Sequence, residues 1–376
     1  MEVKTHGRLG LEAHFRDQFG PSDAGGVIDM EAVFHLTGQM PGSEGCGMKY
    51  FVRLVGAWAI LAAVSGMSAP SPAEIVEVKK IWDRAPHNAF TDLARFRGEW
   101  FCVFREGSRH VSPDGALRVI TSRDGAEWSS AARLTAANAD LRDAKITTTP
   151  DGRLMLTGAA ALHPPAPARH QSLAWFSEDG RHWSEPVKVG ETNQWLWRTT
   201  WHRGTAYSVS YDTAGKNFIR LYASQDGRDF QPLVPTLFDQ GQPNEASLLF
   251  SADDSALCLL RRDGTPGSAQ LGHARPPYTR WEWRDLGVKI GGPQLLHLPD
   301  GRIVVAARLY DGGVRTALLW LDPVAAKLTE IRKLPSGGDT SYAGLVWHEE
   351  RLWVSYYSSH EGATSIYLAK VRLPAK

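Results

Sequence analysis

Arginine recurs at one position of a repeated hairpin, and this recurrence is the clearest chemical signal in the chain. Arg105, Arg261 and Arg308 each lie seven residues past the tight turn of an apolar hairpin, and Tyr211 and Tyr357 take the same place in two further hairpins. Converging guanidinium groups bind a carboxylate in a bidentate manner. The pattern predicts a site for an acidic sugar, on whose faces the tyrosines can stack. The alternative for any single arginine is a surface ion pair.

A second set of side chains is expected at the same place, because the first strand of each hairpin starts where the second ends. This set contains His87, Asn88, Asp92, Arg142, Asp143, Lys145, Trp197, Arg198, Glu245, Gln294 and Tyr342. Arg142, Arg198 and Trp197 are further candidates for substrate binding. His87 can act as an acid or a base near neutral pH, and His110 is a second candidate of this kind. The alternative for His87 is a hydrogen-bonded loop residue.

The hairpins that carry these residues form a six-fold repeat. Their turns contain Gly98, Gly152, Gly204, Asp254, Gly301 and Glu350, spaced by about 50 residues. Further strands follow each hairpin, such as those at 117–122, 172–177, 218–224 and 316–321. Four strands per unit of this length predict an all-β, six-bladed β-propeller. A two-sheet sandwich is the alternative, and equal units at this spacing fit it poorly.

The ends of the chain are expected to close the ring. The sixth unit has three evident strands, at 343–347, 352–357 and 365–372. The segment IVEVKKIW at 75–82 is the predicted fourth strand, since it precedes the first hairpin and has no other partner. Cys102 and Cys258 lie in different units and are expected to be separate core thiols.

The N-terminal part of the sequence is not expected to belong to this fold. Residues 48–69 combine two basic residues with an eleven-residue apolar run and small residues, which is typical of a secretory signal peptide. Residues 1–47 are then a mis-called or disordered extension, and the propeller occupies 70–376. The alternative for the apolar run is a buried helix. A secreted or periplasmic protein without membrane contact after cleavage is expected.

Composition excludes several other classes. The formal net charge is +1, whereas nucleic-acid-binding proteins usually have a basic excess. The sequence contains no phosphate-binding loop, nucleotide fingerprint or metal-ligand motif, so no cofactor or metal is expected. His163 and His170 flank a proline-rich stretch and are interpreted as part of a surface loop.

A second repeated motif, S-x-D-G-x-x-aromatic, follows the third strand of three units, at 122–128, 177–183 and 224–230. The aspartate can bond the backbone of its own turn, glycine permits the turn, and the aromatic ring can pack below it. Together with the six-fold repeat, these motifs resemble the Asp boxes of the sialidase-like (bacterial neuraminidase repeat) superfamily of six-bladed propellers. The resemblance implies a structural role for them.

The resemblance also implies catalytic roles. GDTSYAGLVWHEERLWVSYY looks like the sialidase segment with the tyrosine nucleophile, here Tyr342, and PNEASLLF like the segment with its activating glutamate, here Glu245. Arg261 or Arg262, and Arg308 or Arg315, match members of the family's arginine triad. FREG at 104–107 resembles its first-blade segment, which implies that Asp114 in the following loop is the acid/base. The resemblance thus implies an exo-α-sialidase-like glycosidase that acts on a terminal acidic sugar.

The chain departs from the family at the first blade. HNAFTDL at 87–93 stands where sialidases carry Arg-Ile-Pro, so one triad arginine is missing. His87 lies there instead. In this feature the chain resembles certain α-L-rhamnosidases and ulvan lyases, which are sialidase-like propellers that use a histidine on uronate-containing polysaccharides. The alternative hypotheses are therefore a histidine-dependent lyase or rhamnosidase-like enzyme on uronate polysaccharides, or a glycan-binding propeller without catalysis.

Overall fold

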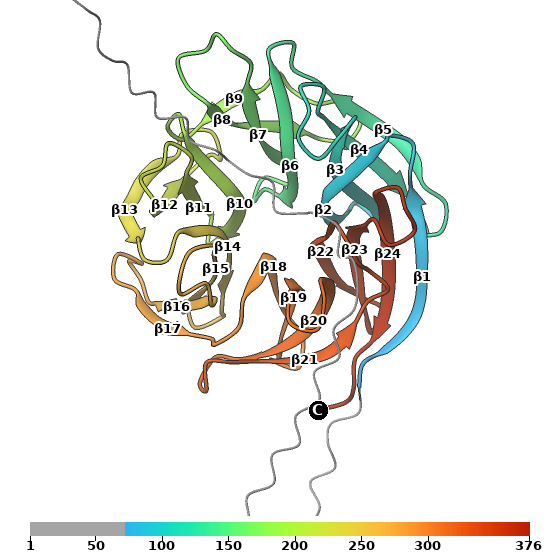
Figure 1. Cartoon of the computed structure of the whole chain (residues 1–376), viewed down its shortest axis with the longest axis vertical. Helices are drawn as coiled ribbons and strands as arrows, with labels where there is room; N and C mark the ends of the chain where they lie inside the picture. Colours follow the sequence, from blue (N-terminus) through green and yellow to red (C-terminus); the bar gives the residue numbers. More distant parts are fainter. Residues whose placement is uncertain (1–71) are drawn as a thin grey trace, which may run out of the picture. The chain divides into compact units, whose positions relative to one another are not determined.

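The computed structural model describes residues 72–376, which form six four-stranded antiparallel sheets arranged around a central axis (Figure 1). This confirms the predicted six-bladed propeller and excludes the two-sheet sandwich. The predicted signal peptide and the extension before it lie outside the described residues. No helix in residues 72–376 has the length and hydrophobicity needed to cross a membrane.

Each blade uses four consecutive strands, except the last. Blade one contains β2 (His87–Phe96), β3 (Glu99–Gly107), β4 (Ala116–Ser122) and β5 (Ser129–Leu134), and blade two contains β6 (Ala139–Thr148), β7 (Leu154–Leu162), β8 (His170–Ser177) and β9 (Val187–Val189). Blade three contains β10 (Gln194–His202), β11 (Thr205–Asp212), β12 (Ile219–Ser224) and β13 (Gln231–Phe238), and blade four contains β14 (Pro243–Phe250), β15 (Ala256–Arg262), β16 (Gln270–Ala274) and β17 (Glu282–Asp285). Blade five contains β18 (Ile290–His297), β19 (Ile303–Leu309), β20 (Arg315–Asp322) and β21 (Lys327–Lys333). Blade six contains β22 (Thr340–His348), β23 (Arg351–Ser358), β24 (Ser365–Arg372) and β1 (Glu74–Trp82).

The six predicted turns join the first two strands of each blade. All six turn residues have a positive φ, from 56° at Glu350 to 85° at Gly301. Glycine takes this conformation without steric cost, which explains its presence in four of the six turns.

The two ends of the described chain pair with each other, as predicted. β1 runs antiparallel to β24, in a register from Glu74 opposite Arg372 to Trp82 opposite Ile366. The first strand therefore completes the last blade.

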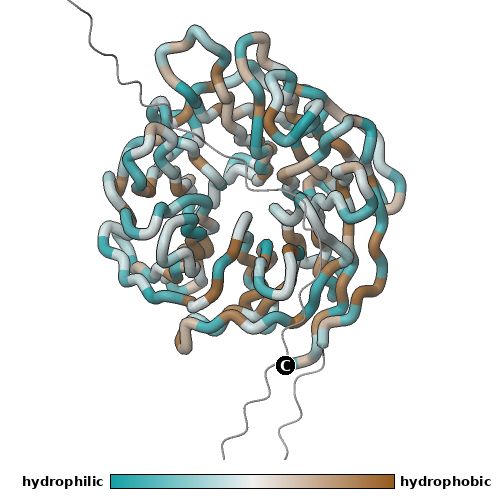
Figure 2. The backbone as a smooth tube through the Cα atoms, viewed as in Figure 1, coloured by the Kyte–Doolittle hydropathy of each residue, from teal (hydrophilic) through white to brown (hydrophobic). Residues whose placement is uncertain are grey.

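Hydrophobic residues between adjacent blades hold the ring together. The buried apolar residues of the described chain fall into six clusters. Five of them each join two neighbouring blades, and the sixth, which includes Trp82 and Trp197, contains residues of blades six, one, two and three. Figure 2 shows hydrophobic residues in every blade. The middle strands β3, β7 and β20 are buried along almost their whole length, because both of their faces are covered. Cys102 and Cys258 are buried and free, as expected for separate core thiols.

The three S-x-D-G-x-x-aromatic turns share one set of hydrogen bonds. In each, the aspartate accepts from the backbone N–H two residues on, at 2.8 Å in all three. In the first two, the tryptophan ring N–H also donates to the glycine carbonyl at 3.2 Å, and the third has Phe230 in that place. The glycine of each turn packs closely on a side chain of the preceding blade, namely Trp353, Phe101 and Met155. The motif therefore joins one blade to the next.

We expect Gly180→Ala to lower the free energy of unfolding by about 3 kcal/mol, because the added methyl overpacks the blade contact. A Cβ at Gly180 would lie 2.2 Å from the Phe101 ring. Gly152→Ala is the control, since Gly152 has a similar φ but no atom within 4 Å of an added Cβ. Denaturant unfolding should show a clearly larger loss for Gly180→Ala, and equal losses would contradict the packing role.

Candidate active site

Every inner strand has a β-bulge at the same level, and these bulges build the site. In each blade, two residues of the first strand face one residue of the second. The bulges comprise residues 90–91, 143–144, 197–198, 244–245, 292–293 and 342–343. A bulge bends the strand and redirects its side chains, and bulges are frequent beside active sites. Phe90, Asp143, Gly292 and Tyr342 have φ between 52° and 64° there.

The bulges of blades four and six bring Tyr342 and Glu245 together. The Tyr342 hydroxyl donates to Glu245 Oε1 at 2.6 Å. Arg261 Nη1 donates to Glu245 Oε2 at 2.8 Å and to the Tyr342 hydroxyl oxygen at 2.9 Å. A buried phenol thus lies between a carboxylate that can take its proton and a guanidinium that can stabilise its anion.

Arg308 flanks the same phenol from blade five. Its guanidinium carbon lies 5.1 Å from the centroid of the Tyr342 ring, and its Nη2 donates to the Tyr357 hydroxyl at 2.8 Å. Arg261 Nη2 and Arg308 Nη1 make no hydrogen bond to any residue in the described part of the chain, and both side chains are partly exposed. Two guanidinium groups therefore have free donors on either side of Tyr342.

The protonation states of the pair follow from burial and charge. Burial raises the pKa of Tyr342 well above its ordinary value, and the negative charge of Glu245 raises it further. The positive charges of Arg261 and Arg308 oppose this shift but do not cancel it. Burial also acts to raise the pKa of Glu245, but the charge of Arg261 and the hydrogen bonds from Tyr342, Arg261 and Gly292 outweigh it and lower the pKa. The resting pair is a neutral phenol beside a carboxylate.

Gly292 supports this pair from blade five. Its N–H donates to Glu245 Oε2 at 2.9 Å, and a Cβ at this position would lie 2.8 Å from the Tyr342 ring. We expect Gly292→Ala to displace the phenol and lower kcat about 10²-fold, because small misplacements of reacting groups have effects of this size. Gly312→Ala is the control, with a similar φ and no neighbour within 4 Å of an added Cβ. Full activity of Gly292→Ala would show that this contact does not position the phenol.

Asp143 is a buried carboxyl group close to this pair, from the bulge of blade two. No hydrogen bond to its carboxylate is found within residues 72–376, and only 9% of the residue is exposed. Burial raises its pKa to about 6, with the charge of Glu245 adding to the effect and that of Lys145 opposing it. The sequence analysis placed Asp143 among the site residues and gave it no role.

Asp114, the acid/base implied by the resemblance, is placed differently. It is exposed in the loop between β3 and β4, where it accepts hydrogen bonds from the Ser108 N–H at 3.0 and 3.1 Å. Hydrogen bonds from Ser112 and Ser108 lower its pKa to about 2. A carboxyl group with this pKa is ionised at neutral pH and is a poor proton donor.

Arg105 lies outside the site, contrary to the expectation for substrate binding. Its side chain is fully buried and bonded to Asp140 at 2.9 Å, the Arg109 carbonyl at 2.8 Å and Ser112 Oγ at 3.0 Å. These contacts hold the loop between β3 and β4. Arg142 joins the same cluster, with Nε donating to Asp140 at 2.5 Å.

Arg198 lines a pocket between the inner strands, and Trp197 is buried beside Tyr342. Arg198 donates to Asp92 at 2.9 Å and to the Ala343 carbonyl at 2.8 Å. Trp197 is 1% exposed, with its ring 5.4 Å from the Tyr342 ring and 4.7 Å from Lys145 Nζ. Trp197 is therefore not accessible to a sugar in this structure, and the Arg198 guanidinium is held by its bonds to Asp92 and Ala343.

The remaining aromatic candidates lie on either side of the pair. Tyr211 stacks on Trp195 at 5.7 Å, and burial together with the charges of Asp143 and Glu245 raises its pKa well above its ordinary value. Tyr357 is buried and donates to Asp339 Oδ1 at 2.7 Å.

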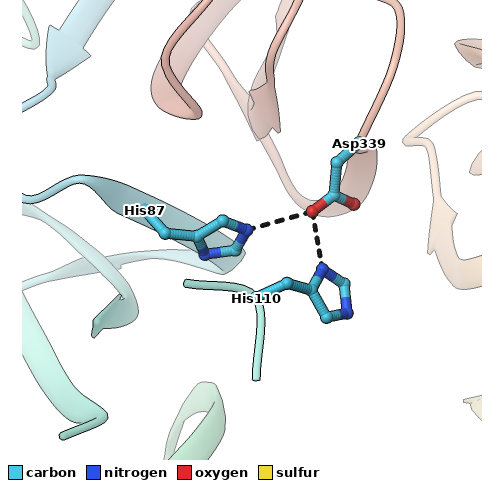
Figure 3. A group of neighbouring side chains, drawn as sticks. All are labelled: His87, His110 and Asp339. Atoms are coloured by element: carbon cyan, nitrogen blue, oxygen red, sulfur yellow. Dashed lines mark hydrogen bonds and ion pairs between the residues drawn. The ribbon is translucent and has the colours of Figure 1, made fainter. Parts of the chain in front are cut away.

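His87 lies beside two residues at the edge of the site, His110 and Asp339 (Figure 3). The Phe90 ring separates this group from the nucleophile candidate, since it lies 5.2 Å from the His110 ring and 5.1 Å from the Tyr342 ring. Asp339 and Phe90 were not predicted from the sequence. Asp339 has a weak signal, since it directly precedes the first strand of its blade, and Phe90 has none.

Comparison of the sequence with family models and with curated proteins gave no match. Solved structures with the same fold are numerous. A protein of unknown function from Dyadobacter fermentans is 20% identical, with a TM-score of 0.71 over 80% of this chain and 99% of that one. Trypanosoma rangeli sialidase, solved with the inhibitor DANA, is 12% identical, with a TM-score of 0.61 over 76% of this chain. This chain has the sialidase-like propeller fold.

Propellers with other specificities are equally similar. The α-L-arabinanase of Penicillium chrysogenum, complexed with arabinobiose, is 14% identical, with a TM-score of 0.62 over 80% of this chain and 98% of that one. The match to the sialidase takes in 55% of that longer chain. At these identities the likeness establishes the fold, and the chemistry depends on the site described above.

Proposed function

We propose that the protein is a glycosidase that hydrolyses a terminal acidic sugar, with Tyr342 as the nucleophile. The observation that carries this proposal is the 2.6 Å hydrogen bond from the buried Tyr342 hydroxyl to Glu245, beside Arg261. Tyrosine nucleophiles replace a carboxylate in sialidases, because a substrate with a carboxylate on its anomeric carbon repels an anionic nucleophile. The sialidase and arabinanase among the similar structures support a glycosidase.

The free donors of Arg261 and Arg308 support an acidic substrate. A carboxylate between them would accept charge-assisted hydrogen bonds from both groups, and it would lie next to the attacking phenol oxygen. Two such groups compensate for the arginine that is missing from HNAFTDL in the first blade.

The reaction proceeds through a covalent sugar–tyrosine intermediate. The Tyr342 oxygen attacks the anomeric carbon while its proton passes to Glu245, and Asp143 donates a proton to the departing oxygen. Water then attacks the anomeric carbon, Asp143 takes a proton from it, and the phenol regains its proton from Glu245. Asp143 suits this role better than Asp114, because its raised pKa allows it to hold a proton near pH 6.

The experiment is the release of sugar from three substrate classes: sialosides, glycans capped with uronic acid, and neutral arabinosides. We expect turnover of an acidic class and little of the neutral one. Turnover of neutral arabinosides alone would overturn the acidic specificity. An unsaturated product that absorbs in the ultraviolet would overturn hydrolysis and favour the histidine-dependent lyase, and glycan binding without any product would favour a non-catalytic propeller.

A further inference from the structure

Three distant segments of the chain bring two imidazoles and a carboxylate to one point. His87 starts β2, His110 lies in the loop between β3 and β4, and Asp339 precedes β22 (Figure 3). Asp339 Oδ2 lies 3.0 Å from His87 Nε2 and 2.7 Å from His110 Nδ1. The three atoms all lie within 4.8 Å of one another.

We propose that His87, His110 and Asp339 bind a divalent transition-metal ion, with Zn²⁺ as the best match. Two imidazole nitrogens and one carboxylate oxygen form a ligand set that Zn²⁺ accepts, with bond lengths of about 2.0–2.2 Å. An ion between the three atoms would need only small side-chain movements. This proposal goes beyond the glycosidase function and does not depend on it.

The surroundings of Asp339 favour metal binding. Its other oxygen, Oδ1, accepts from the Tyr357 hydroxyl at 2.7 Å and lies 3.4 Å from Arg308 Nη2, which leaves Oδ2 for the histidines. Ligating carboxylates are usually fixed by outer hydrogen bonds of this kind.

The histidines differ in accessibility, which gives the site one fixed and one open side. His87 is 7% exposed, and its Nδ1 has no partner in the described part of the chain. Nε2 faces Asp339 Oδ2, so an ion there would take the place of the proton between these two atoms, and the ring would then carry its proton on Nδ1. The His110 side chain is 53% exposed, so ions have access and ligand positions remain open to water or a sugar oxygen.

The test is a calorimetric titration of the full chain with ZnCl₂ alone. Thermal unfolding with and without Zn²⁺ is a second measurement. We expect the wild type to bind one Zn²⁺ ion, and the affinity of His110→Ala for Zn²⁺ to be at least ~10-fold weaker. Because His110 is exposed, this variant should fold normally. A wild-type-specific rise in Tm on adding Zn²⁺ is expected, since ligands that bind the native state stabilise it.

His182→Ala is the matched control, because His182 also pairs with an aspartate, at 2.7 Å, and is highly exposed, but within residues 72–376 it belongs to no group of three possible ligands. It should bind Zn²⁺ like the wild type. Tyr357→Phe removes the hydrogen bond to Asp339 Oδ1 and should weaken binding about 10-fold. Equal Zn²⁺ affinity in the wild type and His110→Ala would overturn the proposal. So would the absence of binding by the wild type at ~100 µM Zn²⁺, which is roughly a hundred times the Kd expected of a useful site.

Discussion

Replacing Tyr342 by Phe should lower kcat by at least ~10⁴-fold, because it removes the nucleophile and keeps the ring. The variant should remain folded, since the aromatic contacts of the ring with Phe90 and Trp197 are kept. The measurement is steady-state hydrolysis of the best acidic substrate, together with a thermal unfolding curve to show that the variant is folded.

Tyr356→Phe is the matched control. Tyr356 is the neighbour of Tyr357 in β23 and donates its hydroxyl to the Pro335 carbonyl at 2.9 Å, away from the site. This variant should lose about 1 kcal/mol of stability through that hydrogen bond and keep wild-type kcat. A tenfold loss of activity corresponds to only ~1.4 kcal/mol of transition-state stabilisation. If Tyr342→Phe keeps more than about a tenth of the activity, Tyr342 is not the nucleophile.

Asp143→Asn should lower kcat by about 10²–10⁴-fold on substrates with poor leaving groups, because it removes the proton donor. On nitrophenyl glycosides the loss should be much smaller in the first step, since nitrophenolate departs without a proton. Asp114→Asn is the control and should keep its activity on both. The opposite result, with Asp114→Asn inactive and Asp143→Asn active, would return the acid/base role to the exposed loop.

The pH dependence of both activity and stability should report Asp143. In the wild type, kcat/KM should fall as the pH rises through about 6, where the proton donor ionises. Because folding raises the pKa of this carboxyl, its contribution to stability is fully present below the ordinary carboxyl pKa and is lost as the pH rises through about 6. Above pH 7, Asp143→Asn should therefore be the more stable protein, by up to ~3 kcal/mol, and below pH 4 the difference should vanish.

The fold could be predicted from the sequence because its signals are local and repeated. A positive φ at a turn favours glycine, and this preference marked four of the six turns before any tertiary contact was considered, while the regular spacing indicated the other two, at Asp254 and Glu350. The closure by β1 followed from counting strands, since a three-stranded last blade needs one more.

The site could be predicted only in part, because register and side-chain direction are tertiary properties. Repeat positions indicated Arg261 and Arg308, and the structure places both beside Tyr342. The same reasoning indicated Arg105, whose guanidinium turns instead to Asp140 and to loop carbonyls that no repeat count reveals. The bulges that aim Asp143 and Tyr342 have no sequence signature, since a bulge depends on the strand opposite.

The pairing of β1 with β24 also fixes the order of events during synthesis. The first strand leaves the ribosome roughly three hundred residues before its partner, which corresponds to about 15–60 s at ordinary elongation rates. Until then Trp82 lacks Ile366 and Leu368, the β24 residues of its cluster. The apolar side chains and the free edge of β1 therefore stay uncovered until β24 is synthesised. A premature stop codon before β24 would leave them uncovered permanently, and the truncated protein would be prone to aggregation and proteolysis.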